Sequence, residues 1–285
     1  MGSSTLSYYP EIMRTSVSTS SFGALLKTWR KTRKRSQLDV ALDAEISARH
    51  LSFVETGRSR PSREMVLLLA DVLEIPLRER NALLGAAGFA PIYRKTDLDA
   101  PEMRAIKSSI EFMLEHHNPY PAIVFDQHWN LLHQNRAAAI LLPMFVGDPA
   151  SLVQRPLNVM RLLFDPRGMR PFIRNWDHLA GTMMQRLHRE AQLAGPEDPI
   201  NQLIAQLFDY GGVPESWRIP RLLEIPDVIA SMDVERDDVR VVMFSAITTL
   251  GTPIDITAQD LRIETFFPAD ESSKKQMVEL STRSR

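Results

Sequence analysis

The chain has 285 residues, of which 44% are hydrophobic and 24% charged, with a net charge of −1 and no Cys. These values are ordinary for a globular protein and exclude a collagen, a coiled coil and a mainly disordered chain. The lack of Cys excludes disulfides, thiolate zinc sites and Cys nucleophiles. Because the chain has no apolar run of ~18 residues and no signal-peptide pattern at its start, we expect a cytoplasmic protein with no membrane partner and about two domains.

The charge is distributed unevenly along the chain. Residues 27–63 hold ten Lys and Arg against four Asp and Glu, a net +6, whereas residues 64–285 carry a net −7. A basic segment in an otherwise acidic chain indicates a local surface that binds a polyanion such as DNA. The alternative is a solvated surface with unevenly spread charges, and charge alone does not decide between the two.

The N-terminal part of the chain contains a series of short helical patterns. Residues 1–21 are rich in Ser and Thr without periodicity, and we expect a flexible lead-in there. From Phe22, apolar residues recur at i, i+3, i+4 and i+7, which predicts an amphipathic helix. Further helices are expected over residues 37–44, 48–56, 62–73 and 77–87. Five short helices, with a tight turn between the second and third, are typical of a helix-turn-helix domain.

This region resembles a known family of DNA-binding domains. The resemblance is carried by three motifs: QLDVALDAEIS at 37–47, LSFVETGR at 51–58 and RPS at 60–62. Over roughly residues 22–88 they resemble the phage-repressor (Xre-type) domain, which implies an all-α helix-turn-helix head over residues 22–90 and a double-stranded DNA operator as partner. One departure is Glu45 in the turn, where this family often has Gly, and it predicts a slightly different turn.

In a helix-turn-helix domain the first turn of the third helix lies nearest the base edges. Arg49 is the expected base reader, because a guanidinium can donate to guanine O6 and N7 together, and Ala48 offers a methyl group to thymine. Gln37, Arg58 and Arg60 suit neighbouring phosphates. The DNA-binding candidates are Gln37, Ser47, Ala48, Arg49, His50, Ser52, Arg58 and Arg60. The alternative for each is a surface residue without a contact.

Two charged residues of the head have a structural interpretation. The resemblance implies that Arg30 of the first helix pairs with Glu55 late in the third. We expect this pair to act as a brace that holds the third helix at its angle, rather than to contact DNA.

The rest of the chain has a different pattern. Residues 91–102 are polar and interrupted by Pro, which predicts a linker. Short apolar strands are expected at both ends of the region that follows, with helices between them, which predicts an α+β domain over residues 103–270. The expected strands are 121–125, 131–134, 239–249 and 261–267, and the expected helices are 105–116, 136–142, 157–163, 172–193 and 199–208. We expect a flexible tail at 271–285.

This second region also resembles a known family. The resemblance is carried by AIVFDQHWN at 122–130, NRAAA at 135–139, PLNVMRLLFDP at 156–166, NW at 175–176 and DP at 198–199. Over residues 103–268 these motifs resemble the MmyB-like ligand-binding domain, in which an Xre-type head is joined to a PAS-like sensor. The resemblance implies a PAS-like α+β domain that binds a fatty acid or a similar small hydrophobic ligand. One departure is Gln134, where the family usually has Trp, and it predicts a more polar wall of the ligand pocket.

The candidates for ligand contact are polar or aromatic residues near these motifs: Trp129, His133, Asn135, Arg136 and Arg161. If the ligand is an acid, an inward Arg would pair with its carboxylate. Arg161 suits this role because it lies between Met160 and Leu162. The alternative is that Arg161 bonds a main-chain carbonyl or an Asp in a packed core.

Patterns typical of enzymes are missing from the sequence. It has no Gly-rich nucleotide motif and no nucleophile elbow, and its seven His are scattered without a third metal ligand. We therefore expect no catalytic residue, no metal and no cofactor beyond the small-molecule effector. The expected function is a DNA-binding transcription regulator that acts as a homodimer. The alternatives are a repressor or an antitoxin-like protein whose second domain only dimerises or binds a protein partner.

Overall fold

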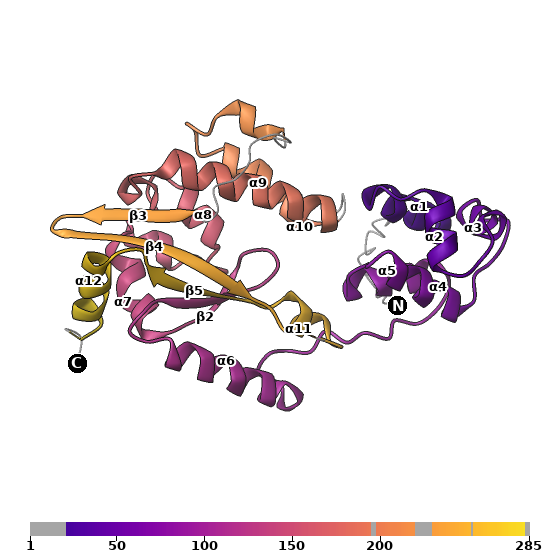
Figure 1. Cartoon of the computed structure of the whole chain (residues 1–285), viewed down its shortest axis with the longest axis horizontal. Coiled ribbons are helices and arrows are strands. Elements are labelled where there is room, and N and C mark those ends of the chain that lie inside the picture. The colour runs from indigo at the N-terminus through magenta and orange to yellow at the C-terminus, as the bar shows by residue number, and fades with distance from the viewer. Residues whose placement is uncertain (1–20, 195–197, 220–229, 252, 283–285) are drawn as a thin grey trace, which may run out of the picture.

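The computed structural model describes residues 21–194, 198–219, 230–251 and 253–282. Its first domain is a bundle of five helices (Figure 1). These are α1 (Phe22–Thr32), α2 (Gln37–Asp43), α3 (Ala48–Glu55), α4 (Arg63–Val72) and α5 (Leu77–Ala86). The lead-in expected at 1–21 lies outside the described residues, except for Ser21.

Serine side chains begin four of the five head helices. Ser21, Ser36, Ser47 and Ser62 each accept a backbone N–H from the first turn of the helix that follows. Such a cap satisfies one of the N–H groups that lack a partner within the helix, and replacing it by Ala costs about 1 kcal/mol. The boundaries of these helices are therefore encoded locally.

The second domain has a five-stranded antiparallel sheet in the order β2-β1-β5-β4-β3. Its strands are β1 (Ala122–Phe125), β2 (Leu131–Gln134), β3 (Ser231–Arg236), β4 (Val239–Thr248) and β5 (Arg262–Pro268). Its α-helices are α6 (Arg104–His116), α7 (Arg136–Met144), α8 (Val159–Phe164), α9 (Trp176–Ala194), α10 (Pro199–Phe208), α11 (Ile256–Asp260) and α12 (Glu271–Thr282). The expected fold class, an all-α head followed by an α+β domain, is confirmed.

Helices cover both faces of this sheet (Figure 1). On one face, Ile110 and Leu114 of α6 pack with Val124 and Ile263 in a small apolar cluster. On the other face, residues of β1, β3 and β4 join those of α7, α8, α9 and α10 in the largest core cluster. Residues alternate between these two faces along each strand. A strand residue's position therefore decides which cluster it joins.

Strand β3 and helix α11 were not expected from the sequence. Strand β4 pairs with β5, as the pattern predicted, but it also pairs with β3. The charged outward residues of β3 hide its strand pattern, and they are paired in the structure: Arg240 contacts Asp233 at 2.9 Å. Helix α11 lies in the connection between β4 and β5, where only a turn was predicted.

The expected flexible tail at 271–285 is wrong for residues 271–282, which form α12. Met277 is buried, and the hydroxyl oxygen of Ser273 accepts the backbone N–H of Val242 at 2.9 Å. Among the described residues of α12, Met277 is the one buried hydrophobic residue. Because the helix buries so few apolar side chains, its sequence has too weak a hydrophobic periodicity to predict a helix. Residues 283–285 lie outside the described part.

Helices α1 and α3 approach each other closely at Gly23. A Cβ atom at this position would lie 2.3 Å from the carbonyl oxygen of Glu55. Only glycine permits this approach without a shift of one backbone against the other. The close crossing places the side chain of Glu55 beneath α1, where it is almost fully buried.

Three side-chain hydrogen bonds compensate the buried carboxylate of Glu55. Arg30 donates from Nε to Oε1 at 2.6 Å and from Nη2 to Oε2 at 3.0 Å, and Gln37 donates from Nε2 to Oε2 at 2.7 Å. Burial alone would raise the pKa of Glu55, but the hydrogen bonds from Arg30 and Gln37 and the charge of Arg30 hold that pKa below its ordinary value. One carboxylate therefore joins α1, α2 and α3.

We expect Arg30→Ala and Glu55→Ala each to reduce the free energy of opening of the head by about 3 kcal/mol, because each leaves a buried partner unpaired. The double variant should lose little more than either single one. A Glu with a depressed pKa stabilises fully above its unfolded pKa of about 4.3 and loses this contribution as the pH falls through its folded pKa. Hydrogen exchange of α3 peptides at several pH values measures both effects, and additive losses would contradict the pairing.

Candidate functional site

The turn before α3 sets the direction in which this helix leaves α2. Glu45, in this turn, adopts a φ of 53°, the left-handed conformation that a Gly would take more readily. The departure from the family pattern at Glu45 is therefore accommodated by backbone strain. Ser47 then caps α3 by accepting the N–H of His50 at 3.1 Å.

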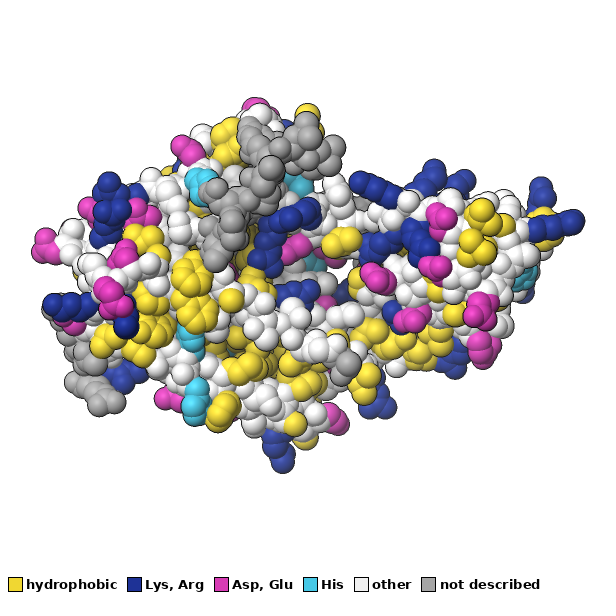
Figure 2. Space-filling model, viewed as in Figure 1, with side chains coloured by type: hydrophobic (Ala, Val, Ile, Leu, Met, Phe, Trp, Pro, Cys, Tyr) yellow, Lys and Arg dark blue, Asp and Glu magenta, His cyan; other side chains and the backbone are white. Residues whose placement is uncertain are grey.

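Two arginines flank an aromatic ring on the exposed side of α3. The guanidinium carbons of Arg49 and Arg58 lie 5.3 and 5.8 Å from the ring centroid of Phe53. Both Arg side chains are exposed. Cation–π contact with Phe53 restrains the two cations at one end of the head. Figure 2 shows Lys and Arg side chains along the upper edge and outer tip of the head.

The other DNA-binding candidates lie on or beside the same helix, with one exception. Ala48, His50 and Ser52 are half-buried on α3, and Arg60 is exposed just beyond it. Gln37 lies on α2, where its amide nitrogen donates to Glu55 rather than standing free for a phosphate. The structure therefore gives Gln37 a bracing contact that the sequence did not predict.

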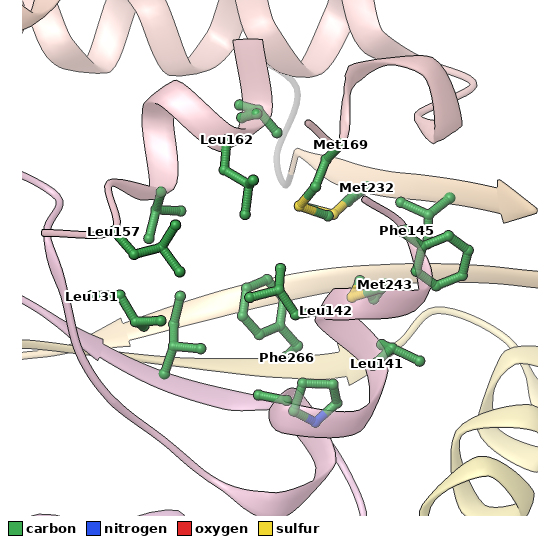
Figure 3. Close-up of a pocket in the computed structure, with 16 residues that line it drawn as sticks. Leu131, Leu141, Leu142, Phe145, Leu157, Leu162, Met169, Met232, Met243 and Phe266 are labelled. Carbon is green, nitrogen blue, oxygen red and sulfur yellow. The ribbon is translucent and has the colours of Figure 1, made fainter. Parts of the chain in front are cut away.

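The second domain contains an apolar cavity of about 90 Å³ between the sheet and its covering helices (Figure 3). All sixteen lining residues are apolar, among them Leu131, Leu142, Phe145, Leu162 and Met169. They come from β1, β2, β3, β4, β5, α7 and α8 and from the segments beside them. The arrangement can hold a hydrocarbon group but offers it no polar partner.

A second cavity, of about 300 Å³, adjoins the first. The two cavities share the lining residues Val159, Leu163, Met232, Met243 and Phe266. The second cavity differs because the guanidinium of Arg186, the carboxyl group of Glu264 and the hydroxyl group of Ser245 also line it. The sequence did not predict a role for these three residues. The only local signal was Glu264, a carboxylate at an inward position of a largely apolar strand.

Of the predicted ligand contacts, only Trp129 lies at the second cavity. Its side chain is buried, and its Nε1 donates to Glu190 at 2.9 Å. His133 pairs in register with Val124, so it lies on the opposite face of the sheet, towards α6. Arg136 is exposed at the start of α7. His133 and Arg136 line neither cavity, and a ligand contact by either residue stays a prediction.

Asn135 and Arg161 make hydrogen bonds to other residues of the protein. The side-chain oxygen of Asn135 accepts the N–H groups of Ala138 and Ala122, and its nitrogen donates to two main-chain carbonyls. Arg161 donates to Gln206 at 2.7 Å and lines neither cavity. Gln134 is exposed, so it does not polarise the cavity wall as expected. The polar groups that reach the ligand space come from other elements.

The head contacts the second domain through α5 and α11. The N–H of Leu77 donates to Oε1 of Gln259 at 2.8 Å, and Nη2 of Arg78 donates to Asp260 at 2.6 Å. Burial raises the pKa of Asp260, and the hydrogen bond from Arg78 opposes this effect. Helix α11 precedes β5 directly, and β5 supplies Glu264 to the second cavity.

The predicted linker is hydrogen-bonded to both domains. Asn81 of α5 donates to the carbonyl of Tyr93 at 2.7 Å, and Thr96 donates from its hydroxyl to Asp255 at 2.6 Å. These contacts anchor the first half of the segment to α5 and to the cap of α11. The linker therefore reinforces the contact between the domains.

The described residues contain neither a membrane-spanning helix nor a cluster of metal-ligating side chains. No helix among them is long and apolar enough to cross a membrane. Within the same residues, no group of three or more His, Asp or Glu side chains is placed to hold a metal ion.

The fold and these surfaces define a class of protein: a DNA-binding transcription regulator with a ligand-binding domain. Residues 21–83 match a helix-turn-helix domain family, and residues 106–280 match the MmyB-like transcription regulator ligand binding domain. Because the second match spans more than half of the chain, the protein belongs to the MmyB-like transcription regulators. Both matched families are regulator domains rather than enzymes. A comparison with curated proteins gave no match.

We expect Arg49→Ala to cost about 1–3 kcal/mol at the preferred DNA site and to relax the preference at one base position. Arg58→Ala should instead weaken binding to all DNA sequences alike. It should also reduce the slope of log affinity against log salt concentration by about one, the value for one phosphate contact. Selection from a random DNA library, followed by titration at several salt concentrations, measures both. Arg189→Ala, an exposed arginine of the second domain, serves as the control. An unchanged base preference in Arg49→Ala would contradict the assignment.

Proposed function

We propose that this regulator senses a small molecule with an unbranched apolar chain, of the kind and size of a medium-chain fatty acid. The observation that carries the proposal is the apolar cavity, in which every lining side chain is hydrocarbon or thioether. A fatty acyl chain is the chemistry that such a lining favours, because burying it removes apolar surface from water without leaving a polar group unpaired.

The size of the ligand follows from the two cavities together. A cavity of about 90 Å³ is too small for a typical ligand, whereas the neighbouring space of about 300 Å³ reaches the usual range. The shared wall includes Met232 and Met243, whose unbranched side chains can change rotamer at little cost. An acyl chain that displaces these side chains would occupy both cavities.

The rival interpretation is a second domain that only dimerises or binds a protein partner. Such a domain would gain stability from a filled core, because voids in a core cost free energy. Two adjoining cavities in the largest apolar cluster favour a ligand over this interpretation. We propose accordingly that the protein acts by binding rather than by catalysis.

We propose that ligand and operator binding are coupled through β5, α11 and α5. Ligand in the cavities would contact Glu264 and Phe266 of β5, and α11, directly before this strand, holds the head through Asp260. The ligand shifts an equilibrium between head orientations that differ in their affinity for the operator. A homodimer suits this scheme, because two heads must match half-sites ~34 Å apart.

We expect decanoic acid and decanol to raise the melting temperature of the full-length protein. At a hundred times the Kd, a ligand stabilises the folded state by about 2.7 kcal/mol, which corresponds to a rise of about 5 °C or more for a domain of this size. Ala138→Met should abolish most of this rise, because Ala138 lines the apolar cavity and the larger side chain fills it. Thermal unfolding with and without each compound measures the effect.

The matched control is Ala139→Met, at the next position of α7, where the side chain is exposed. This variant should keep the full rise in melting temperature. The proposed ligand site would be contradicted if neither compound raised the melting temperature of the unmodified protein. An equal rise in the two variants would contradict it as well.

A further inference from the structure

The second cavity presents a cation whose direction is fixed by its neighbours. Arg186 of α9 donates from Nε to Glu190 at 2.8 Å, and its guanidinium carbon lies 4.7 Å from the ring centroid of Trp129. Glu190 also accepts the Nε1–H of Trp129, so one carboxylate orients both side chains. The Nη groups of Arg186 make no hydrogen bond with any residue that the structure describes. They are therefore free to donate to a ligand.

A buried carboxyl group lines the same cavity. Glu264 is 9% exposed, and its Oε1 accepts the hydroxyl of Ser245 at 2.5 Å. Burial raises the pKa of Glu264, while Ser245 and Arg186 act in the opposite direction. Arg186 forms no ion pair with Glu264, although both residues are described. Glu264 in its protonated form would supply an O–H donor rather than a competing negative charge.

We propose that this second cavity binds the carboxylate of an amphipathic acid, with Arg186 as its ionic partner and Glu264 as a hydrogen-bond donor. The apolar chain extends past Met232 and Met243, which both cavities share, into the apolar cavity. The inference rests on the proposed function and adds the ligand's polar end and the residues that select it. Arg161, outside the cavities, takes no part.

Isothermal titration calorimetry of the full-length protein with decanoic acid and decanol tests the inference. The unmodified protein should bind the acid about tenfold more tightly or better, because hydrogen bonds to a charged group are stronger than those to a neutral group. Arg186→Gln should bring this preference close to one, while the affinity for decanol stays within about twofold. Gln is chosen because it is neutral and retains an N–H donor for Glu190. Arg161→Gln, a matched change outside the cavities, should keep the full preference.

A second pair of variants isolates Glu264 and does not depend on the stability of Arg186→Gln. Glu264→Gln preserves a neutral donor and should keep the preference for the acid, whereas Glu264→Leu should reduce it. Equal affinity of the unmodified protein for acid and alcohol would overturn the carboxylate site and leave the proposed function standing. An unchanged preference for the acid in Arg186→Gln would also overturn the carboxylate site and leave the proposed function standing. Failure to bind either compound would overturn the proposed function itself.

Discussion

The contact between Arg78 and Asp260 is the interaction on which the proposed coupling depends, because it links the DNA-binding head to the helix that precedes β5, a strand that lines the second cavity. Asp260 ends α11, and β5 begins two residues later. Strand β5 is central in the sheet and pairs with both β1 and β4. A displacement of β5 by a ligand at Glu264 or Phe266 would therefore be transmitted to α11 rather than absorbed at a free edge. The linker, bonded to α5 and to the cap of α11, favours the same relation between the domains.

The head and the second domain use buried charge in different ways. In the head, the carboxylate of Glu55 is fully compensated by Arg30 and Gln37, so it fixes the angle of α3 and has no capacity left for a ligand. In the described part of the second domain, Arg186 is oriented by Glu190 but keeps unused donors, and Glu264 has a hydroxyl partner but no cation at contact distance. The first arrangement is a finished structural element. The second is the kind of incomplete polar set that a ligand can complete.

The sequence predicted the head well because its information is local. Helical periodicity, Ser caps and a short turn define each element, and the Arg30–Glu55 pair follows from the family motif. The residues that line the cavities were harder to predict: of the five ligand candidates, only Trp129 lines the second cavity. Asn135 is used as a cap, and Arg161 points away because residues adjacent in a helix face different directions, so its apolar neighbours do not place it in the core. The pairing of β4 with β5 brings Ser245 and Glu264 together, and the packing of α9 on the sheet adds Arg186, which is distant from both in the chain.

The proposed coupling of ligand occupancy to operator affinity depends on the contact of α5 with α11. The most direct test is the ratio of operator Kd values with and without saturating decanoic acid, measured for the unmodified protein, Arg78→Ala and Arg80→Ala. Arg80 is the control, since it lies on α5 but bonds Ile75 and Asp71 within the head. We expect a ratio that differs from one by about fivefold or more in the unmodified protein and in Arg80→Ala. In Arg78→Ala the ratio should approach one, although this variant still binds the acid. An unchanged ratio in Arg78→Ala, or a ratio of one in the unmodified protein, would contradict it.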